Sequence, residues 1–307
     1  MKHISVLLNE SIEELNLNEN SIVVDCTLGR AGHSSEILKK IPNGMLIAFD
    51  QDEEAIIESE EKLNKIAKNY KLIRSNFANI KEELKKINIE HVDAILYDLG
   101  VSSPQLDEQE RGFSFHKDAR LDMRMDKSKE LDAYKVVNEY SIQELENIFF
   151  KYGEEKNSRA IARKIVEMRS VKPIETTLEL SEIIKSSVPE RYRREHHPAR
   201  KIFQAIRIEV NDELNVFESS LRTSLDLLNK NGRICVITFH SLEDKICKKI
   251  FKEVSDIDPT LKKLPIIPKE YQPKFKIIAN IKPSQKEIEN NKRARSSKLR
   301  VIERIEG

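Results

Sequence analysis

Three carboxylates stand at the ends of three short apolar runs in the first third of the chain. Asp25, Asp50 and Asp98 each close a run rich in Val, Ile, Leu and Ala. Helix-like stretches separate these runs, and parallel strands joined by helices direct their carboxyl ends toward one crevice. We therefore expect the three side chains to face a common ligand, since carboxylates accept hydrogen bonds from hydroxyls and amines and attract cations.

The segment after Asp25 reads as a tight turn beside a ligand. Gly29 and Gly32 allow close approach of the backbone, and an acid such as Asp50 can accept hydrogen bonds from two ribose hydroxyls. The stretch Gly-Arg-Ala-Gly lacks the third glycine of the dinucleotide fingerprint, and a carboxylate at the turn would repel a pyrophosphate. S-adenosylmethionine, which carries a sulfonium and an ammonium, therefore fits better than NAD. The alternative is a turn whose glycines serve packing alone.

Asp98 opens a polar loop of restricted backbone, Leu-Gly-Val-Ser-Ser-Pro-Gln, which ends at Gln105. This loop suits methylation of an exocyclic base amine, whose lone pair is delocalised into the ring. An acceptor for an amine hydrogen directs that lone pair toward the methyl group, and orientation supplies most of the remaining acceleration. No metal is needed. The alternative is an ordinary strand-end turn in which Asp98 caps a helix.

Composition limits the classes of protein that this chain can be. Hydrophobic residues make up 39% and charged residues 34% of the 307, and a net charge of +1 identifies no partner. Cys26, Cys235 and Cys247 form no C-x-x-C pair, so we expect reduced thiols in a cytoplasmic protein. No apolar run approaches the ~20 residues that span a membrane. Absence of Trp and a 6% aromatic content argue against an extended base-stacking platform.

The expected elements divide the chain into two parts. Residues 21–100 alternate strands with helices, the strands lying at 22–25, 45–50, 71–75 and 92–98 and the helices at 34–40, 53–69 and 80–86. Residues 108–211 show only helical periodicity, at 131–140, 142–152, 158–168, 177–187 and 199–214. Alternation then resumes, with helices at 221–228 and 243–254 and strands at 233–239, 275–279 and 298–305. We predict an α/β domain with a mostly parallel sheet over residues 1–107 and 212–307, interrupted by an all-helical insertion domain at 108–211.

An ordered set of motifs resembles one bacterial family along nearly the whole chain. The motifs are HISVLL at residues 3–8, DCTLGRAGHS at 25–34, DLGVSSPQ at 98–105, RGFSF at 111–115, LDMRMD at 121–126, HPAR at 197–200, FQAIRI at 203–208, FHSLED at 239–244 and RARSSKLR at 293–300. The set resembles the ribosomal RNA small subunit methyltransferase H family. These are S-adenosylmethionine-dependent enzymes that methylate the exocyclic N4 of a decoding-region cytidine in 16S ribosomal RNA.

The resemblance implies a class I (Rossmann-like) methyltransferase fold and a set of site residues. The implied cofactor contacts are Ala31, Gly32, His33, Asp50 for the ribose, Phe77 beside the adenine, Asp98 and Gln105. Asp98 is also the implied catalytic residue. Whether it contacts the cofactor, the target amine or both stays open, as does the role of His240, which either faces the crevice or caps the following helix.

Two basic clusters suggest contact with RNA. The denser one contains Arg191, Arg193, Arg194, Arg200 and Lys201, with Tyr192 available for stacking, and the second contains Lys292, Arg293, Arg295, Lys298 and Arg300. The alternative for both is a solvated surface. We expect small-subunit ribosomal RNA as the partner, within a ribosomal particle, and the sequence leaves a homodimer open. The motif at 121–126 either shapes a base pocket or is a half-buried segment that packs the insertion against the core.

We expect no metal and no membrane partner. Adjacent His196 and His197 point apart and have no nearby Cys. Three rival functions remain: methylation of a protein or small molecule, a catalytically idle RNA-binding scaffold, and an NAD-dependent oxidoreductase, which the missing glycine disfavours.

Overall fold

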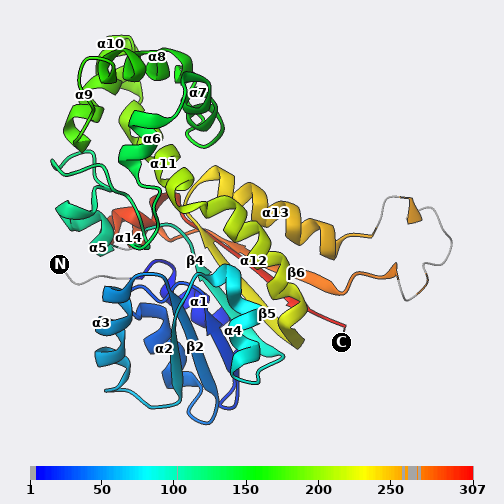
Figure 1. Cartoon of the computed structure of the whole chain (residues 1–307). Helices are drawn as coiled ribbons and strands as arrows, with labels where there is room; N and C mark the ends of the chain where they lie inside the picture. Colours follow the sequence, from blue (N-terminus) through cyan, green and yellow to red (C-terminus); the bar gives the residue numbers. More distant parts are fainter. Residues whose placement is uncertain (1–4, 102, 258–259, 262–267, 269–270, 307) are drawn as a thin grey trace. The chain divides into compact units, whose positions relative to one another are not determined.

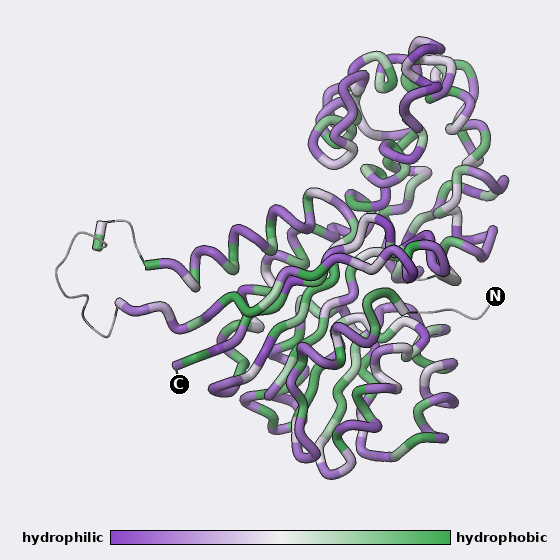
Figure 2. The backbone as a smooth tube through the Cα atoms, turned by 180° about the vertical axis from the view of Figure 1, so that it is seen from behind, coloured by the Kyte–Doolittle hydropathy of each residue, from purple (hydrophilic) through white to green (hydrophobic). Residues whose placement is uncertain are grey.

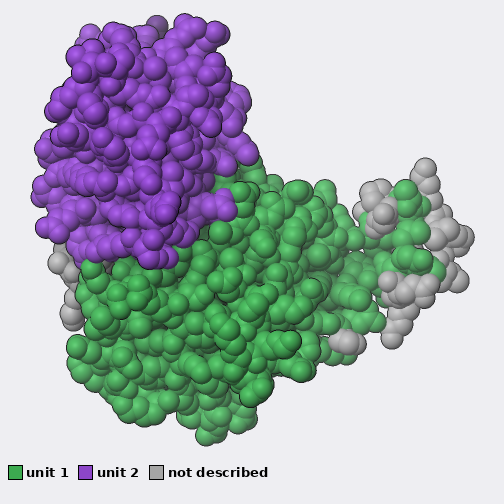
Figure 3. All heavy atoms as spheres, viewed as in Figure 1, with its two compact units in different colours: residues 1–100, 214–307 green, residues 101–213 purple. Residues whose placement is uncertain are grey.

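The computed structural model describes residues 5–101, 103–257, 260–261, 268 and 271–306 (Figure 1). The chain forms two compact units (Figure 3), of which the first contains Met1–Gly100 and Leu214–Gly307 and the second Val101–Glu213. The boundaries thus differ by a few residues from the expected positions. The helix expected over 199–214 ends at Asn211 because Asp212 adopts a left-handed conformation (φ 54°), and the next helix starts at Glu213.

The first unit contains a seven-stranded sheet in the order β3-β2-β1-β4-β5-β7-β6. The strands are β1 Ile22–Asp25, β2 Met45–Asp50, β3 Tyr70–Arg74, β4 Val92–Asp98, β5 Leu228–Thr238, β6 Phe275–Ile281 and β7 Lys298–Arg304. β3, β2, β1, β4 and β5 pair in parallel, whereas β7 pairs antiparallel with both β5 and β6. The predicted Rossmann-like α/β class with a mostly parallel sheet is confirmed.

The sheet is buried on both faces, as the continuous apolar runs require. Along β4, Ala94 and Leu96 pack into one core, while Ile95 and Tyr97 pack into the other, because successive side chains alternate. Figure 2 shows largely hydrophobic strands and, along the flanking helices, alternating hydrophobic and hydrophilic residues. The apolar residues of these helices pack on the sheet.

Helices cover the two faces in two groups. The first core receives side chains of α4 (Ile80–Lys86), α12 (Glu213–Leu227) and α13 (Ser241–Ser255). The other core receives side chains of α1 (Leu8–Glu14), α2 (Gly32–Lys40) and α3 (Glu53–Leu63). The unit is completed by η1 (Phe77–Asn79), α14 (Gln285–Asn290) and η5 (Lys292–Ser296).

Helix α3 is shorter than the expected helix at 53–69. The side chain of Asn69 donates to the carbonyls of Ile41 and Gly44 at 2.8 and 3.0 Å. These bonds fix the chain at the entry to β3, so the helix ends before them. Two further differences are the start of β5 at Leu228 and the longer helix α12, which contains the expected helix at 221–228.

The second unit is helical, and its described residues contain no strand beyond an isolated bridge between Arg120 and Thr176. Its elements are α5 Ser103–Asp107, η2 Gln109–Arg111, α6 Ala133–Glu139, α7 Ile142–Lys151, α8 Ser158–Arg169, α9 Thr177–Ser186, α10 Glu190–Glu195 and α11 Pro198–Asn211. Capping boxes begin α7 and α9. Helix α10 was not expected from the sequence. No described helix of either unit combines the length and the hydrophobicity of a membrane span.

Candidate cofactor and catalytic site

Asp25 closes β1 and organises the turn that follows. Its Oδ1 accepts the N–H of Thr27 at 3.0 Å, and its Oδ2 accepts the hydroxyl of Ser34 at 2.7 Å. Asp25 is 1% exposed, and this burial raises the pKa of its carboxyl although the hydrogen bonds lower it. One oxygen therefore has its partner in the turn and the other has its partner on α2. Asp25 holds the turn to α2, a structural role that the sequence did not distinguish from attraction of a cationic ligand.

The turn is also joined to the neighbouring strands. The hydroxyl of Thr27 accepts the N–H of Asp98 at 2.7 Å, and the N–H of Leu28 donates to Phe49 at 2.9 Å. Gly29 and Ala31 both have positive φ values, 50° and 52°. This conformation is easy for glycine and costly for alanine, so the surrounding hydrogen bonds must hold Ala31 in place at the start of α2.

Asp50 lies at the end of β2, beside this turn. Its Oδ2 accepts the N–H of Gly29 at 2.9 Å, and its Oδ1 accepts the N–H of Asp52 at 2.9 Å. Burial raises the pKa of Asp50 to about 6, against the lowering effect of these two bonds. Each carboxylate oxygen keeps a second lone pair. The side chain is thus oriented by the backbone and can still accept hydroxyl hydrogens.

Gly32 and His33 bring the N-terminal segment onto the turn. A Cβ atom added to Gly32 would lie 1.8 Å from Oγ of Ser5, so only glycine fits there without movement. Nε2 of His33 lies 3.1 Å from the carbonyl oxygen of Val6. Because a carbonyl only accepts, Nε2 carries the hydrogen. Nδ1 of His33 faces Oδ2 of Asp98 at 3.5 Å.

The N-terminal segment is held from a second side by the C-terminal part of the same unit. Leu7 is fully buried, and its N–H donates to Oε1 of Glu287 on α14 at 2.7 Å. Ser5 and Val6 belong to the motif HISVLL, but neither they nor Glu287 were expected as site residues. Their involvement depends on contacts between distant parts of the chain, for which local spacing carries no signal.

Asp98 closes β4 and has one carboxylate oxygen without a hydrogen-bond partner in the described part of the chain. Its side chain is 24% exposed, yet Oδ1 is buried and has no hydrogen-bond partner among the described residues. Burial, and then the charges of Asp25 and Glu243, raise the pKa of Asp98 well above its usual range. Buried polar atoms normally have partners, so Oδ1 is a candidate acceptor for a ligand hydrogen.

Phe77 lies on η1, next to the end of β3, and is partly exposed. Its ring packs edge-to-face against Tyr97, with ring centroids 5.5 Å apart. The hydroxyl of Tyr97 lies 2.6 Å from that of Ser220, which donates to the Phe77 carbonyl at 2.9 Å. The Phe77 ring is therefore fixed from beneath. A fixed, partly exposed ring can pack against a planar base.

The first unit thus contains six of the seven expected cofactor residues, namely Ala31, Gly32, His33, Asp50, Phe77 and Asp98. Gln105 lies on α5 of the second unit and is buried. Ser102, and the side chains of residues 103 and 104, lie outside the described part of the loop.

His240 is the N-cap residue of α13, which corresponds to one of its two expected roles. Oε2 of Glu243 accepts the N–H of Phe239 at 2.7 Å and the N–H of His240 at 3.2 Å. Nε2 of His240 lies 3.0 Å from Oε1 of Glu243. The N-terminus of α13 is therefore capped mainly by the side chain of Glu243.

The first basic cluster divides into exposed and internally paired cations. Arg191 is 92% exposed at its side chain, and Arg193 and Arg200 are also exposed. Arg194 pairs with Glu190 on the same helix at 2.5 Å. Such exposed pairs are weak, so these guanidinium groups remain available to a polyanion.

Lys201 and Tyr192 have internal partners. The Tyr192 hydroxyl donates to the fully buried carboxylate of Glu155, 2.7 and 2.9 Å from its two oxygens, and the pKa of Tyr192 is raised to about 12, mainly by burial. Nζ of Lys201 lies 3.6 Å from the same carboxylate and donates to the carbonyl of Glu154 at 3.2 Å. These contacts anchor α10 to the rest of the second unit. If Tyr192 stacks on a base, as expected from the sequence, its hydroxyl remains bonded to Glu155.

The second basic cluster is smaller than its sequence suggests. Nζ of Lys298 and Nε of Arg300 contact the carboxylate of Asp244 at 2.8 and 2.7 Å. Lys292, Arg293 and Arg295 on η5 are the exposed members.

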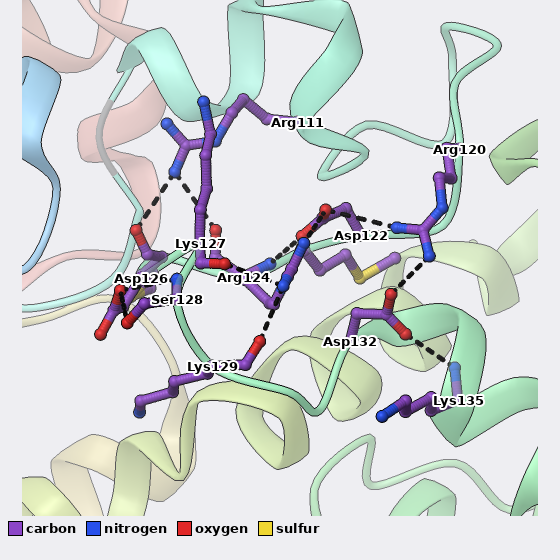
Figure 4. A network of polar contacts seen from close by, with 12 residues as sticks. Arg111, Arg120, Asp122, Arg124, Asp126, Lys127, Ser128, Lys129, Asp132 and Lys135 are labelled. Carbon is purple, nitrogen blue, oxygen red and sulfur yellow. Dashed lines mark hydrogen bonds and ion pairs between the residues drawn. The ribbon is translucent and has the colours of Figure 1, made fainter.

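The motif at residues 121–126 organises its own loop (Figure 4). Nε and Nη2 of Arg124 donate to the two oxygens of Asp122 at 2.9 and 2.8 Å, and Nη1 donates to the carbonyls of Lys127 and Lys129 at 2.9 and 2.7 Å. Leu121 and Met123 of the motif are fully buried in the core of the second unit. These contacts lie within the second unit, so the motif packs the insertion internally.

The fold and the site define a class of protein. A mostly parallel sheet with one reversed strand, β7, next to its edge, a glycine turn after β1 and acids closing β1, β2 and β4 are the features of a Rossmann-like methyltransferase. The sequence profile of the MraW methylase family matches residues 1–305, and the chain belongs to this family. Its cofactor is accordingly S-adenosylmethionine.

Known relatives match the chain over its whole length. The ribosomal RNA small subunit methyltransferase H of Exiguobacterium sibiricum is 52% identical over 307 residues, covering 99% of this chain and 98% of that protein. The protein of the same name from Finegoldia magna is 51% identical over 308 residues, covering 99% of both. A solved putative methyltransferase from Streptococcus mutans in complex with SAH aligns over 98% of this chain and 99% of that one, with a TM-score of 0.45 and 15% identity.

Proposed function

We propose that this protein transfers a methyl group from S-adenosylmethionine to the exocyclic N4 of a cytidine in the decoding region of 16S ribosomal RNA. The observation that carries the proposal is the unsatisfied Oδ1 of Asp98, beside the glycine turn at the carboxyl end of β4. The printed names of the two relatives support small-subunit ribosomal RNA as the substrate.

The residues of the first unit fit the cofactor. Asp50 would accept hydrogen bonds from the ribose hydroxyls through its remaining lone pairs. Gly32 and the backbone of Ala31 and His33 would pass close to the ligand, and Phe77 would pack against the adenine. Gln105 belongs to this set by family resemblance. Bound S-adenosylmethionine supplies the electrophilic methyl group.

Asp98 would act on the target amine. Its Oδ1 would accept one amine hydrogen, which directs the nitrogen lone pair away from the ring, and it would take up the proton that the amine loses on methylation. Nδ1 of His33 faces the other carboxylate oxygen at 3.5 Å, and Nε2 is fixed on the Val6 carbonyl. With Nε2 donating to the carbonyl, Nδ1 can donate to this carboxylate oxygen only in the protonated imidazolium. In that form His33 would be a positioning residue that orients the carboxylate of Asp98.

The helical insertion would contact the RNA, with exposed Arg191, Arg193, Arg194 and Arg200 meeting phosphates and Lys201 supporting α10 from within. A target base within structured RNA must be splayed out, at a cost of a few kcal/mol. We propose that the substrate is ribosomal RNA within a particle and that the enzyme meets it in the cytoplasm.

The test is transfer of tritium from labelled S-adenosylmethionine to small ribosomal subunits of cells that lack this protein, followed by nucleoside analysis. Label in N4-methylcytidine with the wild type, and none with Asp50→Ala, is the expected result. Label in another nucleoside would overturn the assignment of the target amine. Absence of label together with retained cofactor binding would overturn the assignment of the substrate.

A further inference from the structure

Three aromatic rings gather at the surface of the second unit. The Phe115 ring centroid lies 4.2 Å from that of His116 and 4.6 Å from that of His197, with interplanar angles of 48° and 44°. The two imidazoles are 5.9 Å apart. His116 and His197 are exposed and Phe115 is partly exposed. A surface of this kind offers planar faces to a ligand.

The rings are held firmly from beneath. Phe115 packs against the core of the unit and meets the buried ring of Phe203 edge-on at 5.6 Å. The backbone N–H of His116 donates to the hydroxyl of Ser114 at 3.2 Å. His197 is the N-cap residue of α11, directly before Pro198. Fixed rings lose little conformational entropy when a ligand packs on them.

Positive charge surrounds the rings. The N–H of Arg200 donates to the carbonyl of His197 at 3.1 Å, which places this residue one turn into α11. Arg200 is exposed and forms no ion pair within the described part of the chain. Burial, and then the charge of Arg200, lower the pKa of His197 below its usual value.

We propose that Phe115, His116 and His197 form a stacking platform for an unpaired base of the RNA, and that Arg200 binds an adjoining phosphate. Single-stranded RNA is recognised by stacking of splayed bases on aromatic side chains, including His, next to cations that contact the backbone. The inference rests on the proposed function and deepens it. It also qualifies the expectation, based on the low aromatic content, that the chain has no extended base-stacking platform. A count of Phe, Trp and Tyr omits the two histidines.

The alternative is an aromatic cluster that only packs the insertion. Stacking and packing make different predictions for His116, which is exposed. If the cluster only packs, truncation of His116 changes nothing beyond stability. If the cluster stacks on a base, truncation weakens RNA binding, and another planar ring at the same position restores it.

The test measures binding of a single-stranded decoding-region oligonucleotide that carries 2-aminopurine as a fluorescent base. His116→Ala and Phe115→Leu should weaken binding by roughly 5- to 160-fold, the range observed when one stacking side chain is removed. They should also abolish quenching of the 2-aminopurine, while His116→Tyr restores both. Arg200→Gln should reduce the salt dependence by about one phosphate contact.

Phe150→Ala is the matched control, because Phe150 is 67% exposed on α7 and has no ring contact within the described residues. Its affinity for the oligonucleotide should equal that of the wild type. Unchanged affinity and quenching in His116→Ala would overturn the platform. An equal loss of affinity in Phe150→Ala would also overturn the platform, because any exposed aromatic ring would then contribute to RNA binding. Because RNA binding is measured without methyl transfer, failure of the platform is distinguishable from failure of the proposed reaction.

Discussion

At the scale of single residues, the acids at the strand ends have different tasks. Asp25 has partners for both oxygens in its turn and on α2, and Asp50 is oriented by two backbone N–H groups. Asp98 has one oxygen without a partner among the described residues. Sequence spacing predicted all three as neighbours. It could not assign their tasks, because those depend on which hydrogen-bond donors surround each carboxylate.

Substitution of Asp98 tests its role in the transfer step. Asp98→Asn preserves the shape of the side chain and removes the group that takes up the proton, so we expect kcat to fall about 100-fold or more. The dissociation constant for S-adenosylhomocysteine, measured by calorimetry, should stay within about threefold if the side chain acts on the amine. A variant with full activity would contradict the assignment.

The same carboxyl should govern the pH dependence of the reaction. Its raised pKa means that the protonated form persists to higher pH than for an ordinary Asp, and only the ionised form can accept the amine proton. Single-turnover rates of the wild type should therefore rise with pH through this pKa. The residual rate of Asp98→Asn should not show this increase with pH.

Asp50 should make cofactor binding sensitive to pH. The pKa of Asp50 is about 6, and the ionised carboxylate is the better acceptor for ribose hydroxyls. Affinity for S-adenosylhomocysteine should therefore fall as pH decreases through 6, to about one tenth at pH 5 of its value at pH 7.5. In Asp50→Asn the affinity should be lower throughout and should lose this dependence. An unchanged pH profile in this variant would show that another group titrates.

At the scale of elements, the N-terminal segment and the glycine turn form one packed structure. Gly32→Ala would place a methyl group against Ser5, and overpacking of this kind costs about 1–3 kcal/mol. We expect a lower melting temperature and weaker cofactor binding. The double variant Ser5→Gly/Gly32→Ala removes the obstructing side chain and should recover most of both losses. Equal defects in the single and double variants would exclude this contact as the cause.

The loop at residues 121–126 should be a stability element of the insertion. Arg124→Lys cannot reproduce the paired bonds to Asp122 or the bonds to two carbonyls, so unfolding free energy should fall by about 1–3 kcal/mol. Lys129→Ala is the matched control, because only the backbone carbonyl of Lys129 accepts from Arg124. Affinity for S-adenosylhomocysteine should be unchanged in both variants. A loss of cofactor affinity without a loss of stability would contradict a purely structural loop.

At the scale of the whole molecule, alternation of strands and helices sufficed to predict the sheet. The strand expected at 71–75 lies one residue earlier, and the strand expected at 233–239 begins at Leu228. Periodicity locates apolar faces but not ends, which depend on contacts such as those of Asn69. Helix α10 was missed because it has six residues and almost no apolar face, and it is held through Tyr192 and the buried Glu155.

Charge along the sequence does not show which cations have partners within the protein. Lys298, Arg300 and Lys201 read as candidate RNA contacts, yet they pair with Asp244 and Glu155, which lie far away in the chain. Conversely, Phe115 and His197 are in contact although more than eighty residues separate them in the sequence. No local sequence pattern predicts this contact.

The most direct test of the account is to locate the methyl group in the RNA. Small subunits from cells that lack this protein would be incubated with the enzyme and S-adenosylmethionine, and nuclease fragments of their 16S ribosomal RNA would be analysed by mass spectrometry. The account predicts one added methyl group, on N4 of a cytidine in the decoding-region fragment, and none with Asp98→Ala. A methyl group on another atom or outside that region would contradict it.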